Sequence, residues 1–195
     1  MPRDAKRDMV IGAVRVLRER GVDGTTLDAV LARSGGRRGS IYHHFPHGRT
    51  QLLDEALKFA GESVTSLIDR VARDGSSALL VSFTAFWKKT LAETDYAGGC
   101  PVLSAAVSGE PVPGLVTRSG AILDHWCRSF SDVLVTEGLT ESTASRLART
   151  VVAATEGAVV LARATRSCDP LDDVAAELEL LIESHKLFAG AAASK

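Results

Sequence analysis

The sequence contains few of the features that mark secreted, membrane or disulfide-stabilised proteins. Its three cysteines, Cys100, Cys127 and Cys168, are far apart and odd in number, which favours a reducing compartment over a disulfide scaffold. No apolar run approaches the roughly 20 residues that a membrane-spanning helix needs. The amino terminus is charged throughout and lacks the apolar centre of a signal peptide. We therefore expect a cytoplasmic protein that contacts no membrane.

Patterns of catalysis and metal binding are also absent. The chain has no Gly-x-Ser-x-Gly nucleophile motif. The histidines His43, His44 and His47 could in principle bind a metal, but adjacent histidines on a helix point in different directions and no Cys-x-x-Cys pair accompanies them. We expect no catalytic residue, no metal site and no cofactor.

Strand patterns are missing as well, and helical periodicity takes their place. No stretch combines sustained alternation with strand-forming residues. Apolar residues recur instead at spacings of three and four, as in Leu53, Leu57, Ala60 and Val64. An all-α chain of about nine helices is predicted, with helices near 7–21, 26–34, 37–44, 49–73, 77–93, 102–107, 115–136, 141–166 and from 169 onward.

Residues 25 to 49 carry the most specific pattern. A short helix is predicted after Thr25 or Thr26, and Thr25 with Asp28 resembles a capping box. Ser34-Gly35-Gly36 would end that helix in a tight turn. A second helix would then begin at Arg37 and end before Pro46. Two short helices joined in this way are typical of a DNA-reading helix-turn-helix.

The second of these helices has an apolar face and a polar face. Ile41 and Phe45, four residues apart, are predicted to point inward. The other face offers groups that can donate to phosphates or base edges, and a glycine that allows close approach to DNA. A solvated polar helix end is the plainer interpretation. The DNA-contact set is Arg37, Arg38, Gly39, Ser40, Tyr42, His43 and His44, with Thr26 and Arg49 expected to hold phosphates at neighbouring helix starts.

The distribution of charge agrees with a DNA-binding amino-terminal end. Residues 1 to 50 contain ten lysine and arginine residues and five acidic residues, a net charge of +5, whereas the whole chain carries −1. A basic end on an acidic remainder is expected when only one domain meets phosphate. Chance clustering of charge on a small domain is the alternative.

Residues 4 to 64 resemble the TetR family of transcriptional repressors. The resemblance lies in the arginine-rich first helix, the Gly-Val-Asp-Gly-Thr-Thr-Leu segment, the Ser-Gly turn and the Tyr42-His43-His44-Phe45 signature. It implies a three-helix DNA-binding domain over 4–64 and a helical-bundle ligand-binding and dimerisation domain over 65–190. The implied function is a repressor that binds a palindromic double-stranded DNA operator and is released by a small-molecule inducer. The alternatives are a redox- or metal-responsive DNA-binding regulator that uses Cys or His and, more distantly, a helical enzyme or adaptor.

The aromatic residues of the chain gather in its middle, where they predict either a ligand cavity or a packed core. Small-molecule sites are mostly apolar with a few polar groups, and the family resemblance implies an inducer site between the middle helices. The candidate ligand-binding residues are the aromatic Phe83, Phe86, Trp87, Trp126 and Phe130 and the polar Thr90, Cys127 and Glu156.

The last two helices are predicted to form a homodimer. Residues 141 to 166 are rich in alanine and glycine, which let helices approach closely, and the helix from Asp169 has an apolar stripe. Burial within one chain is the alternative. The stretches Gly98–Val102 and Glu156–Ala158 further resemble the LmrA/YxaF-like branch of the family, which implies repression of multidrug-resistance genes and planar aromatic inducers.

Overall fold

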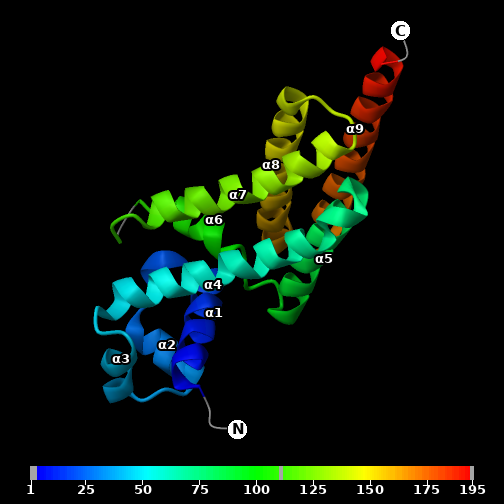
Figure 1. Cartoon of the computed structure of the whole chain (residues 1–195). Helices are drawn as coiled ribbons and strands as arrows, with labels where there is room; N and C mark the ends of the chain where they lie inside the picture. Colours follow the sequence, from blue (N-terminus) through cyan, green and yellow to red (C-terminus); the bar gives the residue numbers. More distant parts are fainter. Residues whose placement is uncertain (1–3, 110–111, 194–195) are drawn as a thin grey trace. The chain divides into compact units, whose positions relative to one another are not determined.

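The described part of the chain consists of α-helices joined by short connections (Figure 1). The structure is a computed structural model that describes residues 4–109 and 112–193. Within these ranges there are nine α-helices, one short 3-10 helix and no strand, so the predicted all-α fold is confirmed. The helices are α1 Ala5–Gly24, α2 Leu27–Ser34, α3 Arg38–His44, α4 Gly48–Val71, η1 Ala72–Asp74, α5 Ser76–Glu93, α6 Pro101–Ala106, α7 Leu115–Thr136, α8 Glu141–Thr165 and α9 Asp169–Ala193.

Contacts divide the chain into two compact units. The first contains the residues up to Ser63 together with Ala97–Ile122, and the second contains Val64–Tyr96 together with the residues from Leu123 onward. The chain therefore crosses between units inside α4, between Tyr96 and Ala97, and inside α7. The predicted domains 4–64 and 65–190 follow chain order, whereas the contacts place Ala97–Ile122 with the amino-terminal helices.

The first unit is built around α1. Asp4 caps this helix by accepting a hydrogen bond from the Arg7 backbone N–H at 3.1 Å. Gly12 lies where α1 meets α2, and a Cβ at this position would lie 3.1 Å from the Cβ of Ser34. Glycine thus permits the close packing of α1 on α2. The buried core of this region comprises Met9, Val10, Ala13, Val14, Val16, Val30, Leu31, Ile41, Phe45, Leu52, Ala56 and Ala60.

Helix α6 packs on α1 in the same unit. It begins with Pro101 at its first turn, where the missing N–H of proline leaves no hydrogen bond unmade. The buried Cys100 precedes it, and the Cys100 Sγ accepts a hydrogen bond from the Leu103 backbone N–H at 3.4 Å. Cys100 is therefore a helix-capping residue in the core.

The second unit contains α5, α8 and α9, which pack on one another. Helix α5 has no side-chain cap at Gly75. The carboxylate of Glu137, just after α7, accepts the Ser76 backbone N–H at 2.7 Å instead. Lys186 of α9 forms an ion pair with the same carboxylate at 2.9 Å. Glu137 thus joins the start of α5 to α9.

The small residues of α8 divide between two faces. Ala144, Ala148, Ala158 and Ala162 are buried within the chain, whereas Ala153 and Gly157 are exposed. The homodimer prediction drew on the small residues of α8 as a set, but the buried alanines pack α8 inside its own unit, and the exposed positions are the ones open to a second protomer. None of the helices in the described ranges is long and apolar enough to cross a membrane.

Candidate nucleic-acid interface

Helices α2 and α3 form the predicted helix-turn-helix. Thr26 is the cap of α2, and its Oγ1 accepts the Ala29 backbone N–H at 3.1 Å. The capping box expected between Thr25 and Asp28 was wrong, because Thr25 lies one residue too early. The buried Thr25 instead donates its hydroxyl to the Gly21 carbonyl at 2.7 Å.

Two glycines make the turn between these helices. Gly35 has a φ of 69°, in the left-handed region that favours glycine, and its N–H closes α2 on the Leu31 carbonyl at 2.9 Å. A Cβ on Gly36 would lie 2.9 Å from the Met9 Cε and 3.0 Å from the Leu31 Cδ2. The turn therefore favours glycine at position 35 for its backbone angle, whereas a methyl group at position 36 would require the side chains of Met9 and Leu31 to shift.

Helix α3 is anchored on its inner face and open on its outer face. Ile41 and Phe45 are fully buried in the core of the first unit. The side chain of Tyr42 is 59% exposed. Arg37, Arg38, Gly39 and His43 are also exposed, and a Cβ on Gly39 would meet no atom within 4 Å. The outer face thus presents cationic, hydroxyl and imidazole groups on a firmly seated helix.

Ser40 and His44 lie at the edges of this face and are half-buried. The Ser40 hydroxyl donates to the Arg37 carbonyl at 3.0 Å, which secures the first turn of α3. The His44 ring lies edge-on to Phe45, with 6.5 Å between ring centroids. Both residues therefore support the helix as well as bordering its outer face.

Arg38 forms an ion pair that the sequence did not reveal. Its Nη2 lies 3.3 Å from a carboxylate oxygen of Asp28 on α2. Both side chains are mostly exposed, so the pair adds little stability. The pair orients the Arg38 guanidinium, because Asp28 holds it from the preceding helix α2. No local motif marks a pair of this kind, because the two residues are ten positions apart.

Arg49 is half-buried in the first turn of α4 and bonds to the end of α1. Its Nε donates to the Thr25 carbonyl at 2.8 Å, and its Nη2 donates to the Val22 carbonyl. Arginine has five N–H groups, so others remain to meet a phosphate. Arg49 therefore positions the helix-turn-helix as well as carrying a charge beside it.

The second unit holds the aromatic residues predicted to bind a ligand. Phe83 lies at their centre, with ring centroids 6.2 Å from Trp87, 6.2 Å from Trp126 and 5.5 Å from Phe130, all edge to face. These four side chains are buried, and the half-buried Phe86 lies 5.0 Å from Trp87. Edge-to-face packing of this kind stabilises a core, as the alternative interpretation of the sequence expected.

The tryptophans of this aromatic core differ in their polar contacts. The Trp126 Nε1 donates to the Thr65 hydroxyl at 3.2 Å. The buried Trp87 Nε1 has no hydrogen-bond partner among the residues that the structure describes. A buried donor without a protein partner is uncommon, and Trp87 differs from Trp126 in this respect.

The polar residues of the predicted ligand set come from three helices, α5, α7 and α8, and differ in burial. Thr90 and Glu156 are buried, and Cys127 is half-buried. Burial raises the pKa of the Cys127 thiol although the charge of Arg149 acts in the opposite direction. A raised pKa lowers the thiolate fraction, which disfavours a reactive sensor role for Cys127.

Two family descriptions match the chain. The description of tetR-family bacterial regulatory proteins matches residues 11–56, and that of the C-terminal domain of LmrA/YxaF-like transcriptional regulators matches residues 77–177. An HTH-type transcriptional regulator of Mycobacterium tuberculosis is 36% identical over 180 residues, which cover 89% of this chain and 92% of the relative. The chain belongs to the TetR family.

Other TetR-family proteins are similar to this chain over most of its length. The HTH-type transcriptional regulator LmrA of Bacillus subtilis is 27% identical over 173 residues, covering 86% of this chain and 91% of LmrA. A TetR transcriptional regulator from Chloroflexus aurantiacus, solved as a crystal structure, has a TM-score of 0.76 at 26% identity and covers 92% of this chain and 94% of its own. The chain is therefore a transcriptional regulator with a helix-turn-helix, and not an enzyme.

The metal-responsive alternative concerns histidines that lie in the described part of the chain. Within that part, no group of three or more His, Cys, Asp or Glu residues could hold a metal ion. His43 and His44 are adjacent, with ring centroids 5.2 Å apart and planes at 71°. These imidazoles therefore belong to the outer face and edge of α3.

Proposed function

We propose that the protein is a ligand-responsive repressor that binds a palindromic operator as a homodimer and is released by a small apolar or aromatic inducer. The observation that carries the DNA-binding part is the outer face of α3, which stands on the buried Ile41 and Phe45. A short helix needs such anchoring to place side chains accurately in a major groove.

The proposed contacts follow from position on the helix-turn-helix. Thr26 and Arg49 lie at helix starts, where N–H groups and positive charge suit phosphate. The exposed Arg38 can read a guanine edge with two donors. Gly39 would allow the backbone of α3 to approach the DNA. The remaining contacts are assigned to Arg37, Ser40, Tyr42, His43 and His44.

Fluorescence anisotropy on a duplex from the DNA upstream of the protein's own gene tests this assignment. A triple variant with Arg37→Ala, Arg38→Ala and Tyr42→Ala should lose binding, because each replaced side chain is exposed and its loss leaves the core intact. Arg128→Ala on α7 is the matched control for loss of an exposed arginine. Equal binding by the wild type and the triple variant would remove α3 as the reading helix.

The homodimer is supported by apolar side chains that α8 and α9 expose. Val160 and Leu161 on α8 are 52% and 55% exposed, and Leu180 on α9 is 63% exposed. Leu187 and Phe188, also on α9, are 74% and 76% exposed. Large apolar side chains left exposed on a protein surface can mark a protein–protein interface, and two half-sites need two recognition helices.

Light scattering tests the dimer at micromolar concentration. Leu161→Arg should shift the protein toward monomer, because an unpaired charge in an apolar contact is costly. Val81→Arg on α5 is the matched control, since Val81 is 65% exposed and lies outside α8 and α9. A monomeric wild type, or equal effects of the two substitutions, contradicts the proposed interface.

The inducer site is proposed at the aromatic core of the second unit. Phe83, Phe86, Trp87, Trp126 and Phe130 supply apolar walls, and Thr90, Cys127 and Glu156 supply polar contacts. Planar aromatic compounds should quench tryptophan fluorescence and weaken operator binding over the same concentration range, because linkage makes the two effects reciprocal. A compound that saturates the fluorescence change without altering operator affinity contradicts the inducer role.

A further inference from the structure

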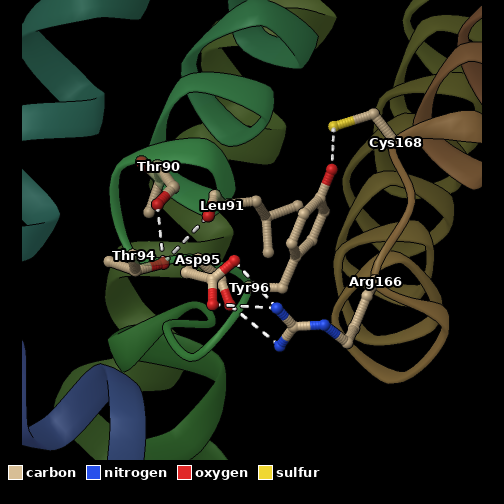
Figure 2. Close-up of polar contacts among 7 residues, drawn as sticks. All are labelled: Thr90, Leu91, Thr94, Asp95, Tyr96, Arg166 and Cys168. Carbon is tan, nitrogen blue, oxygen red and sulfur yellow. Dashed lines mark hydrogen bonds and ion pairs between the residues drawn. The ribbon is translucent and has the colours of Figure 1, made fainter.

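The turn that follows α5 contains two residues in a left-handed backbone conformation, and the connection between α8 and α9 contacts both of them (Figure 2). Asp95 and Tyr96 have φ values of 49° and 60°, and Arg166 in the α8–α9 turn has a φ of 55°. Residues other than glycine rarely adopt left-handed conformations. Aspartate adopts them more readily than tyrosine does. Two consecutive residues of this kind persist only where surrounding contacts hold them.

Arg166 and Cys168 make these contacts with Asp95 and Tyr96. Both oxygens of the Asp95 carboxylate lie 2.8 Å from the Arg166 Nη2, and the Arg166 Nη1 donates to the Asp95 carbonyl at 3.2 Å. The Arg166 guanidinium also lies 5.8 Å from the centre of the Tyr96 ring. At the far end of that ring, the Tyr96 hydroxyl lies 3.7 Å from the Cys168 Sγ.

We call Asp95, Tyr96, Arg166 and Cys168 the latch. An exposed ion pair alone contributes little, but here it acts with a carbonyl hydrogen bond, a cation–π contact and a hydroxyl–thiol contact on adjacent residues. The hydrogen bond with Cys168 raises the pKa of Tyr96, and the hydrogen bond with Asp95 raises the pKa of Arg166. The latch therefore fixes both the backbone and the side chains of residues 95 and 96.

The latch lies directly before one of the points at which the chain passes between the two units. The chain passes from the second unit to the first directly after Tyr96. After two intervening residues, the Gly99 N–H donates to the Arg18 carbonyl of α1 at 3.0 Å, and α6 then packs on α1. The other two crossings lie inside the continuous helices α4 and α7. We call Ala97 and Gly98, the short nonhelical connection at this crossing, the strap. The residues before it contact the α8–α9 turn, and the residue after it is hydrogen-bonded to α1.

We propose that the latch couples the α8–α9 turn to the DNA-binding unit by restricting the conformations of the strap at residues 97 and 98. This proposal rests on the proposed operator binding. When only some conformations of a protein can bind, the apparent Kd rises in inverse proportion to their fraction. Release of the latch enlarges the set of strap conformations, and operator affinity falls.

The test combines amide hydrogen exchange with anisotropy on the DNA upstream of the protein's own gene. The variants are Asp95→Asn, Arg166→Gln and their double, and the control is Arg128→Gln, whose ion pair with Asp124 lies within α7. Asparagine tolerates the left-handed conformation, and both latch side chains are mostly exposed, so the variants retain the fold. Exchange should accelerate in residues 94–99, and operator Kd should rise by about fivefold, a usual size for coupling between sites.

The double variant should behave like each single variant, because both break the same contact. Unchanged exchange in residues 94–99 overturns the latch itself. Faster exchange with wild-type operator affinity overturns its coupling role and leaves the proposed function intact. A wild type that binds no duplex from the upstream region overturns the proposed function and this coupling with it.

Discussion

The Arg49 Nε lies 2.8 Å from the Thr25 carbonyl oxygen and joins the first turn of α4 to the connection between α1 and α2. The same guanidinium holds the Val22 carbonyl at the end of α1. Thr25 and Thr26 form this connection, and they donate their own backbone N–H groups to the Val22 and Gly24 carbonyls at 3.1 and 3.0 Å. Arg49 therefore fixes the angle at which the helix-turn-helix leaves α1.

Replacement of Arg49 should reveal this structural role. We expect Arg49→Ala to lower the free energy of unfolding by about 2 kcal/mol, since hydrogen bonds to a charged donor contribute about that much. Arg49→Lys should restore only part of the loss, because an ammonium group cannot reproduce the fork of a guanidinium. Urea unfolding measures both. Full recovery in the lysine variant would show that charge alone matters at this position.

Substitution of Gly39 should affect the stability of α3 and operator binding in opposite directions. Because a Cβ at this position meets no atom within 4 Å, Gly39→Ala should leave the fold intact and stabilise α3 by up to about 1 kcal/mol. The added methyl group would lie on the outer face of α3, where it should weaken operator binding. Thermal unfolding and anisotropy measure the two effects. Unchanged operator affinity would place Gly39 outside the interface.

Glu137 should make stability depend on pH. Burial by itself would raise the pKa of Glu137, but hydrogen bonds from Ser76 and Lys186 outweigh it and hold the pKa below its usual range. The folded state thus binds the proton less readily than the unfolded chain. This contribution is complete above the unfolded pKa of about 4.3 and is lost as pH falls through the lower folded value.

Accordingly, Glu137→Gln should reduce the free energy of unfolding by about 1 kcal/mol at pH 7, the usual effect of losing a helix cap. The difference from wild type should shrink below pH 4. Glu183→Gln is the matched control, because Glu183 also pairs with Lys186 but caps no helix. A pH-independent difference between wild type and Glu137→Gln contradicts the role of the charge.

The two tryptophans of the aromatic core should respond differently to replacement by phenylalanine. Both substitutions remove similar volume from a buried site, but only Trp126 loses a hydrogen bond, to Thr65. Trp87→Phe removes a buried donor that lacks a protein partner among the described residues. We expect Trp126→Phe to be the more destabilising by about 1 kcal/mol. Denaturant unfolding of both variants decides the comparison, and equal losses would show that volume alone governs it.

The limits of sequence reasoning are clearest at α8. Its small residues correctly marked a helix that packs closely, but the sequence did not show which neighbours it packs against. Ala158 is buried inside its own chain, whereas Gly157 beside it is exposed. Adjacent positions on a helix point in directions about 100° apart. The assignment of a face to the core or to a partner needs the positions of the other helices.

The sequence by itself determined the helical fold, the helix bounds to within a few residues, and the glycine turn with its two-faced third helix. These features arise from periodicity, capping and turn chemistry, which act over about four residues. Only the tertiary structure decided that Arg49 holds Thr25, that Asp28 pairs with Arg38, and that Glu137 caps α5 across 61 positions. Such partners depend on how distant helices pack, and no local pattern along the chain specifies them.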